Sequence, residues 1–284
     1  MPGRSRDMET IPPASGAGQA LYLRLMTEQL TGWDDPRAML ERALKENLFL
    51  LLLQRILPLK AGTADPLCYE VLLRLKQEED SLLPPGGFFD VAESLGMMAK
   101  IDRWVVRAVL LYCAARMRGD PARPLPMMCI NVSGAALRST SFLGAVQEEI
   151  KQAGVPPKVL CFEVNERDVI EHPAAARAFV AALKSQGCRF TLDSFGSTRV
   201  SFNHLNELPV DFIKIDGVII ESMLQGPLGP ATVKAINLVC KEVGIRTIAE
   251  FVENRKTLDK LREIGVDYVQ GFGIARPEPV SKIP

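Results

Sequence analysis

Leu160-Cys-Phe-Glu163 is a short apolar run closed by a carboxylate, and the same plan recurs along the chain. The other runs of this kind are Leu67-Cys-Tyr-Glu70, Cys129-Ile-Asn131, Phe190-Thr-Leu-Asp193, Phe212-Ile-Lys214, Ile248-Ala-Glu250 and Tyr268-Val-Gln270. Buried parallel strands read as short apolar runs, and α/β barrels place their chemistry at the strand ends. A single polar residue of this kind would only mark a solvated strand end. A whole ordered series predicts one site assembled from many strand ends.

Helical patterns separate most of these runs, in residues 101–117 and around Phe142, Ala174, Thr232 and Arg255. Strands that alternate with helices indicate βαβ units and a parallel sheet. A further strand over residues 48–59, which carries Gln54, brings the number of candidate strands to eight, which is enough to close a barrel. The chain has 284 residues, of which 47% are apolar, and this suits one barrel of about 250 residues. We therefore predict an α/β fold, a TIM-like (β/α)8 barrel.

The chain divides into three parts on composition. Residues 1–20 are rich in proline, glycine, serine and arginine, which predicts a disordered lead. Residues 21–47 have a helical pattern, and Asp35-Pro36 reads as an N-cap followed by proline at the first helical position. Residues 48–284 form the predicted barrel domain.

Charge and cysteine usage exclude several classes of function. The formal net charge is zero, so the chain lacks the basic field that binding to a nucleic acid polymer normally requires. The six cysteines are scattered without a C-x-x-C pair, which favours buried, reduced thiols and a cytoplasmic location. The apolar run at 48–53 is too short to cross a bilayer, so we expect no membrane insertion.

Several motifs resemble those of the EAL domains, which bind and often hydrolyse the bacterial second messenger cyclic di-GMP. The motifs are Glu70-Val-Leu-Leu-Arg74, Asn131-Val-Ser133, Glu163-Val-Asn-Glu166, Leu192-Asp193-Ser-Phe-Gly196, Lys214-Ile-Asp216, Ala249-Glu250-Phe-Val-Glu253 and Gln270-Gly271. The resemblance runs from about Leu48 to Pro279. The first motif and the Glu-Phe-Val-Glu variant look more like the FimX branch, which regulates type IV pili.

The resemblance implies a site for Mg²⁺ or Mn²⁺, whose preferred ligands are oxygens. Its ligands would be Glu70, Asn131, Glu163, Asp193 and Glu250. Glu70, Asn131, Glu163 and Asp193 would hold the first ion. Asp193 would also bridge to a second ion, joined by Glu250 and by the residue after Asp193, where the family has an aspartate and this chain has Ser194. A neutral hydroxyl compensates two cations less than a carboxylate does, so we expect the second metal position to be impaired.

The loop after Asp193 also departs from the family. The family's Gly-Thr-Gly-Tyr-Ser-Ser stretch reads Gly196-Ser-Thr-Arg-Val-Ser here, while Glu166 matches a glutamate that steadies this loop. Lys214 and Glu253 match catalytic positions, and the lysine would lie beside the attacked phosphate. Lys214 could instead be a structural lysine paired with Asp211 or Asp216. The departures predict weak or vestigial catalysis.

The ligand positions are better preserved. By resemblance, they are Gln54, Glu70, Leu72, Arg74, Asp102, Asn131, Asp193, Phe251, Glu253 and Gln270. Arg74 would grip a phosphate, because its planar fork suits bidentate contact, although it could be a surface arginine. Gln54 could equally be a polar residue near a turn.

Two further ligand positions each have an alternative. Asp102 would pair with a guanine edge, or it is an acid near a helix N-terminus, favoured by the macrodipole. Phe251 stands where most catalytic relatives have glycine. It would stack on a guanine, or it packs into the barrel rim.

These residues favour a cyclic di-GMP receptor or effector with a degenerate phosphodiesterase site, which binds the dinucleotide without requiring metal and signals to a partner protein. Resemblance to FimX makes a PilZ-type adaptor a candidate partner. One alternative is an active metal-dependent phosphodiesterase that produces pGpG. A scaffold that binds neither metal nor nucleotide is another, but the retained Gln54, Arg74 and Glu253 argue against it.

Overall fold

The computed structural model describes residues 33–60, 67–76, 82–197 and 200–283. The predicted lead and the first part of the predicted helical segment lie outside these ranges. Thr198 and Arg199 of the altered loop also lie outside them. Within the described ranges, none of the helices combines the length and the apolar character that crossing a bilayer requires.

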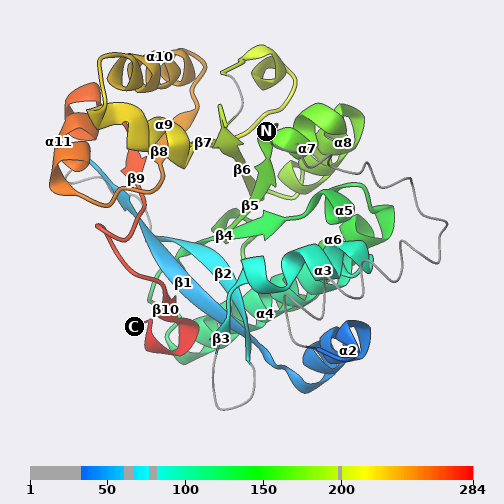
Figure 1. Ribbon diagram of the computed structural model, residues 1–284. Helices are drawn as coiled ribbons and strands as arrows, with labels where there is room; N and C mark the ends of the chain where they lie inside the picture. Colours follow the sequence, from blue (N-terminus) through cyan, green and yellow to red (C-terminus); the bar gives the residue numbers. More distant parts are fainter. Residues whose placement is uncertain (1–32, 61–66, 77–81, 198–199, 284) are drawn as a thin grey trace, which may run out of the picture.

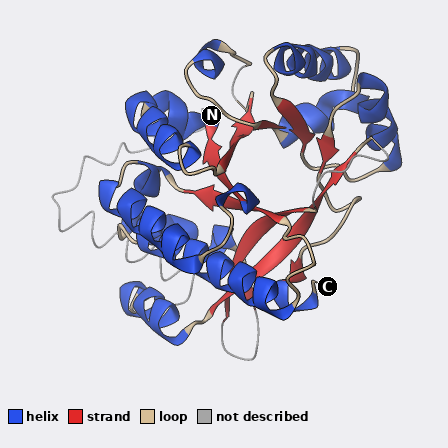
Figure 2. Ribbon diagram, turned by 180° about the vertical axis from the view of Figure 1, so that it is seen from behind, coloured by secondary structure: helices blue, strands red, loops and turns tan. Residues whose placement is uncertain are grey.

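Eight strands form a closed barrel, as predicted, with the helices around its outside (Figure 2). The barrel strands are β1 (Phe49–Pro58), β2 (Cys68–Lys76), β4 (Met127–Val132), β5 (Leu160–Asn165), β6 (Arg189–Phe195), β7 (Phe212–Ile215), β8 (Arg246–Ala249) and β9 (Tyr268–Val269). They follow one another in chain order around the sheet, and pairing of β1 with both β2 and β9 closes it. Two short strands, β3 (Leu82–Leu83) and β10 (Glu278–Pro279), extend the sheet beside β2 and β1.

The prediction of a wholly parallel sheet is wrong at β1. This strand runs antiparallel to β2 and to β9, whereas β2 and β4 to β9 run parallel to one another. A parallel crossover needs a dozen or more residues, usually with a helix. Only residues 59–67 connect β1 to β2, so the chain returns directly in the opposite direction.

Helices follow most of the parallel strands and lie outside the barrel (Figure 1). They are α3 (Phe89–Ser94), α4 (Met98–Gly119), α5 (Gly134–Leu137), α6 (Thr140–Ala153), α7 (Glu166–Glu171), α8 (Pro173–Lys184), α9 (Gly217–Glu221), α10 (Leu228–Glu242) and α11 (Arg255–Ile264). Short 3₁₀ turns occupy residues 85–87, 157–159, 203–206, 222–224 and 280–282. Apolar side chains between the sheet and these helices make the main core.

One helix precedes the barrel. Helix α2 (Pro36–Glu46) begins as the sequence predicts, because the side chain of Asp35 accepts a hydrogen bond from the Ala38 N–H. Its buried face contributes Leu40 and Ala43 to the main core. The helix is thus packed on the domain.

A second, smaller apolar cluster lies in the barrel interior. Its members are Ile56, Cys68, Met127, Cys129, Cys161, Phe212, Ile248 and Tyr268. Side chains alternate along a strand with a period of two, and most of these residues stand two positions before a polar residue of the predicted site. They therefore form the layer directly beneath that site, in the layered interior typical of such barrels. All six cysteines of the chain are buried and free, as predicted.

Candidate ligand and carboxylate site

The structure brings most of the predicted strand-end residues together around the side chain of Lys214. Its ammonium lies 3.0 Å from Glu70 Oε2, 3.1 Å from Glu163 Oε2, 3.0 Å from Glu250 Oε1 and 3.6 Å from Asp193 Oδ1. We call Lys214 with these carboxylates the carboxylate cluster. Its members come from β2, β5, β6, β7 and the end of β8, and they meet because parallel strands put their carboxyl ends at one mouth.

The alternative partners of Lys214 are wrong. Asp211 forms an ion pair with Lys184, with 2.9 Å between Asp211 Oδ2 and Lys184 Nζ. Asp216 caps α9, because its side chain accepts a hydrogen bond from the Val218 N–H. Both aspartates are near Lys214 in sequence, but the strand alternation and the turn point them away from the barrel interior.

Burial and mutual repulsion shape the protonation of the carboxylate cluster. Burial holds the pKa of Glu163 well above its ordinary value and raises the pKa of Glu250 to about 7, although Lys214 opposes both shifts. Burial also acts on Glu70, but Lys214 and hydrogen bonds from Asn131 and Gln270 outweigh it, so the pKa of Glu70 is lowered. The pKa of Lys214 is well above its ordinary value, because the surrounding carboxylates outweigh its burial. The ammonium of Lys214 is therefore kept in its charged form.

Two amides fix the orientation of Glu70. Asn131 Nδ2 donates to Glu70 Oε1 at 2.8 Å, and Gln270 Nε2 donates to Glu70 Oε2 at 2.6 Å. Gln270 Nε2 also lies 3.1 Å from Gln54 Oε1, while Gln54 Nε2 donates to the carbonyl of Ala275 at 3.0 Å. Gln54 is 7% exposed and lies in the middle of β1, so its alternative reading as a polar residue near a turn is wrong. It ties the carboxylate cluster to the segment after β9.

Ser194 lies at an irregularity of β6, where the pairing with β7 shifts register between Leu192 and Phe195. Its backbone is left-handed, with φ 55°, a conformation that aspartate and asparagine adopt more readily than serine. Its hydroxyl lies 3.1 Å from Asn165 Nδ2 and 3.4 Å from Asp193 Oδ2. The side chain at this position is therefore held by Asn165 beside the carboxylate cluster.

The loop after β6 has the support that the sequence predicts from Glu166. This buried glutamate accepts a hydrogen bond from the Gly196 N–H at 2.8 Å. Gly196 needs to be glycine, because its φ is 80° and an added Cβ would lie 2.8 Å from Ile219.

The donor set fits one hard cation. Glu163 Oε1 and Asp193 Oδ1 are buried and accept no hydrogen bond from the described residues, and carboxylate oxygens suit Mg²⁺ or Mn²⁺. Glu70, Asn131, Glu163, Asp193 and Glu250 are the residues that would hold it. The part of the chain that is described nevertheless contains no group of three or more acids, histidines or cysteines already arranged for a metal. The ammonium of Lys214 stands at the centre of the carboxylates instead.

A cavity of about 300 Å³ opens beside the carboxylate cluster. Its walls include Gln54, Glu70, Leu72, Arg74, Glu250, Phe251, Glu253, Gln270, Gly271, Phe272 and Pro277. Glu70, Leu72 and Arg74 alternate along β2 and so face the same side of the sheet. Arg74 is half-buried in this wall, and its Nη1 donates to the Leu73 carbonyl at 2.7 Å. It is therefore a cavity arginine, and its alternative reading as a surface residue is wrong.

Phe251 is held on the rim of this cavity in a strained conformation. Its φ is 52°, and an L-residue pays roughly 1–2 kcal/mol in this region. The ring rests on Gly217, where an added Cβ would lie 2.4 Å from Phe251 Cδ2, yet 58% of the residue is exposed. The alternative in which Phe251 is packed away into the barrel rim is therefore wrong.

Phe272 is a cavity residue that the sequence analysis missed. It is 62% exposed and lines the same cavity as Phe251, and the guanidinium of Arg276 lies 5.9 Å from its ring centroid. The available signal was its place directly after Gln270-Gly271. Glu253 also lines this cavity, but it is exposed, and the ion pairs that Lys214 makes within the described ranges go to other carboxylates.

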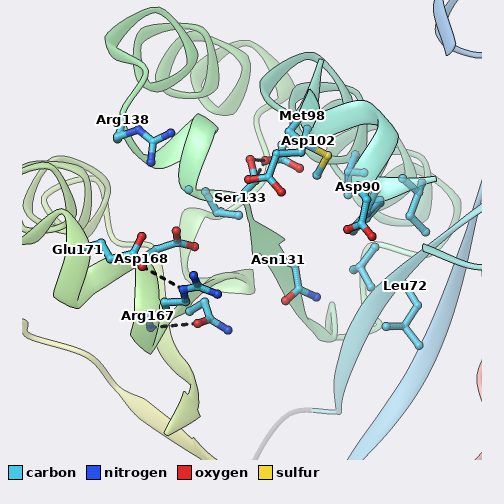
Figure 3. Close-up of a pocket in the computed structure, with 18 residues that line it drawn as sticks. Leu72, Asp90, Met98, Asp102, Asn131, Ser133, Arg138, Arg167, Asp168 and Glu171 are labelled. Carbon is cyan, nitrogen blue, oxygen red and sulfur yellow. Dashed lines mark hydrogen bonds and ion pairs between the residues drawn. The ribbon is translucent and has the colours of Figure 1, made fainter. Parts of the chain in front are cut away.

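A second cavity, of about 620 Å³, shares Leu72 with the first cavity in its walls (Figure 3). Its walls include Asn131, Met98 and Asp102 as well as Arg138, Arg167, Asp168 and Glu171. The first cavity offers the exposed aromatic rings of Phe251 and Phe272, whereas this one combines apolar walls with carboxylates, two amides and two arginines. We call the two cavities, which share Leu72 of β2, the groove.

Asp102 is placed differently from the sequence prediction. Helix α4 begins at Met98, so Asp102 lies in its second turn, and the reading as an acid favoured by the helix macrodipole is wrong. Its carboxylate accepts from the Ser133 N–H at 2.9 Å and the Ser133 hydroxyl at 2.6 Å. Burial raises the pKa of Asp102 to about 6, against the effect of these hydrogen bonds.

The fold is a closed (β/α)8 barrel with polar side chains at one mouth and a groove beside it. It belongs to the class of α/β-barrel proteins, whose functional sites lie at the carboxyl ends of the strands. The family model of the EAL domain matches residues 37–277, a range that begins inside α2. The chain belongs to the EAL domain family.

The curated relatives include proteins named as phosphodiesterases. "Cyclic di-GMP phosphodiesterase PdeB" of Shewanella oneidensis is 34% identical over 242 residues, covering 84% of this chain and 28% of that protein. "Cyclic di-GMP phosphodiesterase PdeF" of Escherichia coli is 30% identical over 241 residues, covering 85% and 31%. The chain thus spans about a third of the length of these relatives.

Solved structures include two EAL domains of FimX in complex with cyclic di-GMP. The domain from Pseudomonas aeruginosa superposes with a TM-score of 0.79 at 30% identity, covering 86% of this chain and 96% of that chain. The domain from Xanthomonas citri gives a TM-score of 0.80 at 26% identity, covering 92% and 99%.

Proposed function

We propose that the chain is a cyclic di-GMP receptor whose degenerate EAL site binds the intact dinucleotide. The observation that carries this proposal is Phe251, an exposed aromatic kept in a left-handed conformation on the rim of the cavity that contains Arg74. Strained residues persist where function uses them, and an aromatic face offers a stacking platform for a base. The FimX domains bound to cyclic di-GMP support the same ligand.

In this proposal the groove divides the dinucleotide between its cavities. Phe251 and Phe272 offer faces to one guanine, and Arg74 binds a phosphate between the bases. Asp102 and Asn131 lie where the second guanine would present its polar edge. Gln54 and Gln270 support the wall between the carboxylate cluster and the ligand.

Binding should not require a divalent ion, because these contacts come from side chains. Ser194 supports weak or absent hydrolysis, since its neutral hydroxyl is engaged with Asn165 where a second metal would need a carboxylate. Lys214 and Glu253 are then vestiges of a catalytic site.

A metal-dependent phosphodiesterase that produces pGpG is the second candidate. The retained carboxylates favour it, in particular the buried oxygens of Glu163 and Asp193 that accept no hydrogen bond from the described residues. The phosphodiesterase names of the curated relatives favour it as well.

We further propose that the bound state is passed to a partner protein in the cytoplasm. The likeness to FimX makes a PilZ-type adaptor of the type IV pilus system the partner to test first.

One experiment separates the two candidate functions. The purified chain is titrated with cyclic di-GMP by calorimetry in EDTA, and separately incubated with the ligand in saturating Mn²⁺ while pGpG is measured by chromatography. A receptor binds in EDTA and releases little or no pGpG. Turnover near the median for enzymes, about 10 s⁻¹, would replace the receptor with the phosphodiesterase.

A further inference from the structure

Helix α3 forms part of the wall of the second cavity. It spans only six residues. Its side chains Phe89, Asp90 and Glu93 line that cavity, and Figure 3 shows Asp90 on the same side of it as Leu72. Isolated helices shorter than about 12 residues are marginal in water, so α3 depends on contacts with the rest of the fold. The contacts that hold α3 therefore also hold this wall.

The two ends of α3 differ in their charge. Asp90 lies in the first turn, where a negative charge suits the helix macrodipole, but the last turn of α3 has no basic residue of its own. The helix ends at Leu95, and Gly96 follows with φ 65°, a common way for a glycine to end a helix. A positive charge at this end must therefore come from another element.

Helix α2 supplies that charge. Arg37 lies in the first turn of α2, and its Nη2 donates a hydrogen bond to the carbonyl of Leu95 at 3.0 Å, across 58 positions of the sequence. A cation beside the last carbonyls of a helix satisfies an acceptor and suits the macrodipole. Helix α2 is itself fixed, because Leu40 and Ala43 are fully buried in the main core. Arg37 thus connects α3 to a firmly packed element.

The opposite wall of the second cavity is fixed by a close contact. Asp168 of α7 rests on Gly134 of α5, where an added Cβ would collide with the carboxylate. Burial raises the pKa of Asp168, and the negative charges of Glu171 and Glu93 add to this shift. Glu93 of α3 therefore acts on the opposite wall across the cavity. The position of α3 sets the width of the cavity and its negative charge.

We propose that Arg37 is a positioning residue for the ligand: it caps α3 from outside the cavity and holds Asp90 and Glu93 where the second guanine would bind. The inference rests on the proposed receptor function and deepens it. A guanine presents N–H donors on one edge, and carboxylate oxygens accept such donors, so the acids of α3 add acceptors beside Asp102. A displacement of α2 would then change ligand affinity without any contact between α2 and the ligand.

The first test compares Arg37→Ala with Arg42→Ala in the absence of nucleotide. Arg42 is the matched control, because it is also exposed on α2 but pairs with Glu46 of the same helix, at 3.9 Å. Hydrogen exchange of the backbone amides of α3 is followed by mass spectrometry, and urea unfolding checks that both variants are folded. We expect faster exchange in α3 in Arg37→Ala only.

The second test measures affinity for cyclic di-GMP by calorimetry in EDTA. Arg37→Ala should bind about two- to fivefold more weakly than the unmodified chain, the change that corresponds to losing one charge interaction at a helix end. Arg37→Lys should restore most of the affinity, because it returns the positive charge, and Arg42→Ala should bind normally. In a chain that carries Asp90→Asn and Glu93→Gln, adding Arg37→Ala should have no further effect.

Unchanged exchange of the α3 amides in Arg37→Ala would overturn the inference. An affinity loss of the same size in the Asp90→Asn, Glu93→Gln background would also overturn it, because Arg37 would then act elsewhere. The outcome is separable from the proposed function. An unmodified chain that binds no cyclic di-GMP rejects the receptor and with it the ligand role of Arg37, whereas exchange in α3 still decides whether Arg37 supports the cavity wall.

Discussion

Phe251 combines an unfavourable backbone conformation with an exposed ring. Replacing it therefore allows an effect on ligand affinity to be distinguished from an effect on the stability of the fold. Replacing it by glycine removes the strain of φ 52° but also removes the aromatic face. We expect Phe251→Gly to be no less stable than the unmodified chain in urea unfolding. Its affinity for cyclic di-GMP should fall by about 1–3 kcal/mol in calorimetry, the usual contribution of base–aromatic stacking.

Leu228→Ala is the control for loss of an exposed apolar side chain away from the groove, and it should leave affinity unchanged. A Phe251→Gly variant that binds normally would show that the ring has no role as a platform.

Arg74 carries the phosphate contact in the proposed complex. Arg74→Ala should weaken cyclic di-GMP binding by roughly 1.5–3 kcal/mol, the range for hydrogen bonds to charged groups. Arg55→Ala is the matched control, because Arg55 is exposed on β1, next to the inward-facing Gln54. Equal affinities of the two variants, measured by calorimetry, would remove Arg74 from the ligand site.

Asp102 predicts a specific pH dependence of stability. Its pKa in the folded chain is about 6, above the ordinary 3.8, so the native state holds the proton more tightly than the unfolded chain does. This contribution is fully present below about pH 4 and is lost as the pH rises through about 6. Asp102→Asn keeps an acceptor for the Ser133 N–H without the charge.

We therefore expect Asp102→Asn to gain stability relative to the unmodified chain between pH 5 and pH 8, by about 1–1.5 kcal/mol. Urea unfolding of both proteins at the two pH values measures the difference. Two proteins whose stabilities change in parallel would show that Asp102 is not the titrating group.

At the scale of elements, the end of β6 is where the proposed loss of a second metal can be tested. Ser194→Asp restores a carboxylate in a left-handed position that aspartate tolerates well. Mn²⁺ affinity in calorimetry should rise, and pGpG production should recover at most in part. The partial recovery follows because Phe251 still occupies the rim and the loop after Gly196 still differs from that of the family.

Ser194→Asn has the same shape and backbone preference without the charge. Comparing the two variants separates the effect of the charge from the effect of a less strained backbone. A gain in Mn²⁺ affinity as large as that of Ser194→Asp would contradict the role of the missing carboxylate.

The strand ends also show which part of the site can be predicted from the sequence. Each polar residue that closes an apolar run is carried inward by the strand alternation, so the meeting of Glu70, Glu163, Asp193 and Glu250 was predictable. The reversed direction of β1 was readable in principle from its short connection to β2.

Other features depend on contacts between distant segments. Phe272 gives no periodic signal, and its role as a cavity wall appears only when the segment after β9 folds against β2. The burial of Asp102 depends on Ser133, which is 31 residues away in the sequence. Such contacts are set by packing between elements, which local patterns do not report.

For the molecule as a whole, the buried cysteines give a test of the closed barrel. All six are free and buried, and burial raises the pKa of Cys113, Cys188 and Cys240 to about 12. Thiolate, not thiol, is the reactive form. The native chain should therefore react with Ellman's reagent only on the timescale of unfolding, with all six thiols becoming reactive in urea. A thiol that reacts within seconds in native buffer would contradict this packing.

The antiparallel strand β1 places the seam of the barrel beside the ligand groove. Gln54 of β1 contacts Gln270, 216 residues further along the chain, and β1 also pairs with β10 near the end of the described chain. A dinucleotide held by Arg74 on one side and Phe251 and Phe272 on the other would join chain segments that are remote in sequence. Only the folded chain brings these segments together, so bound dinucleotide would stabilise the folded state by mass action, and the apparent Tm would rise with ligand concentration.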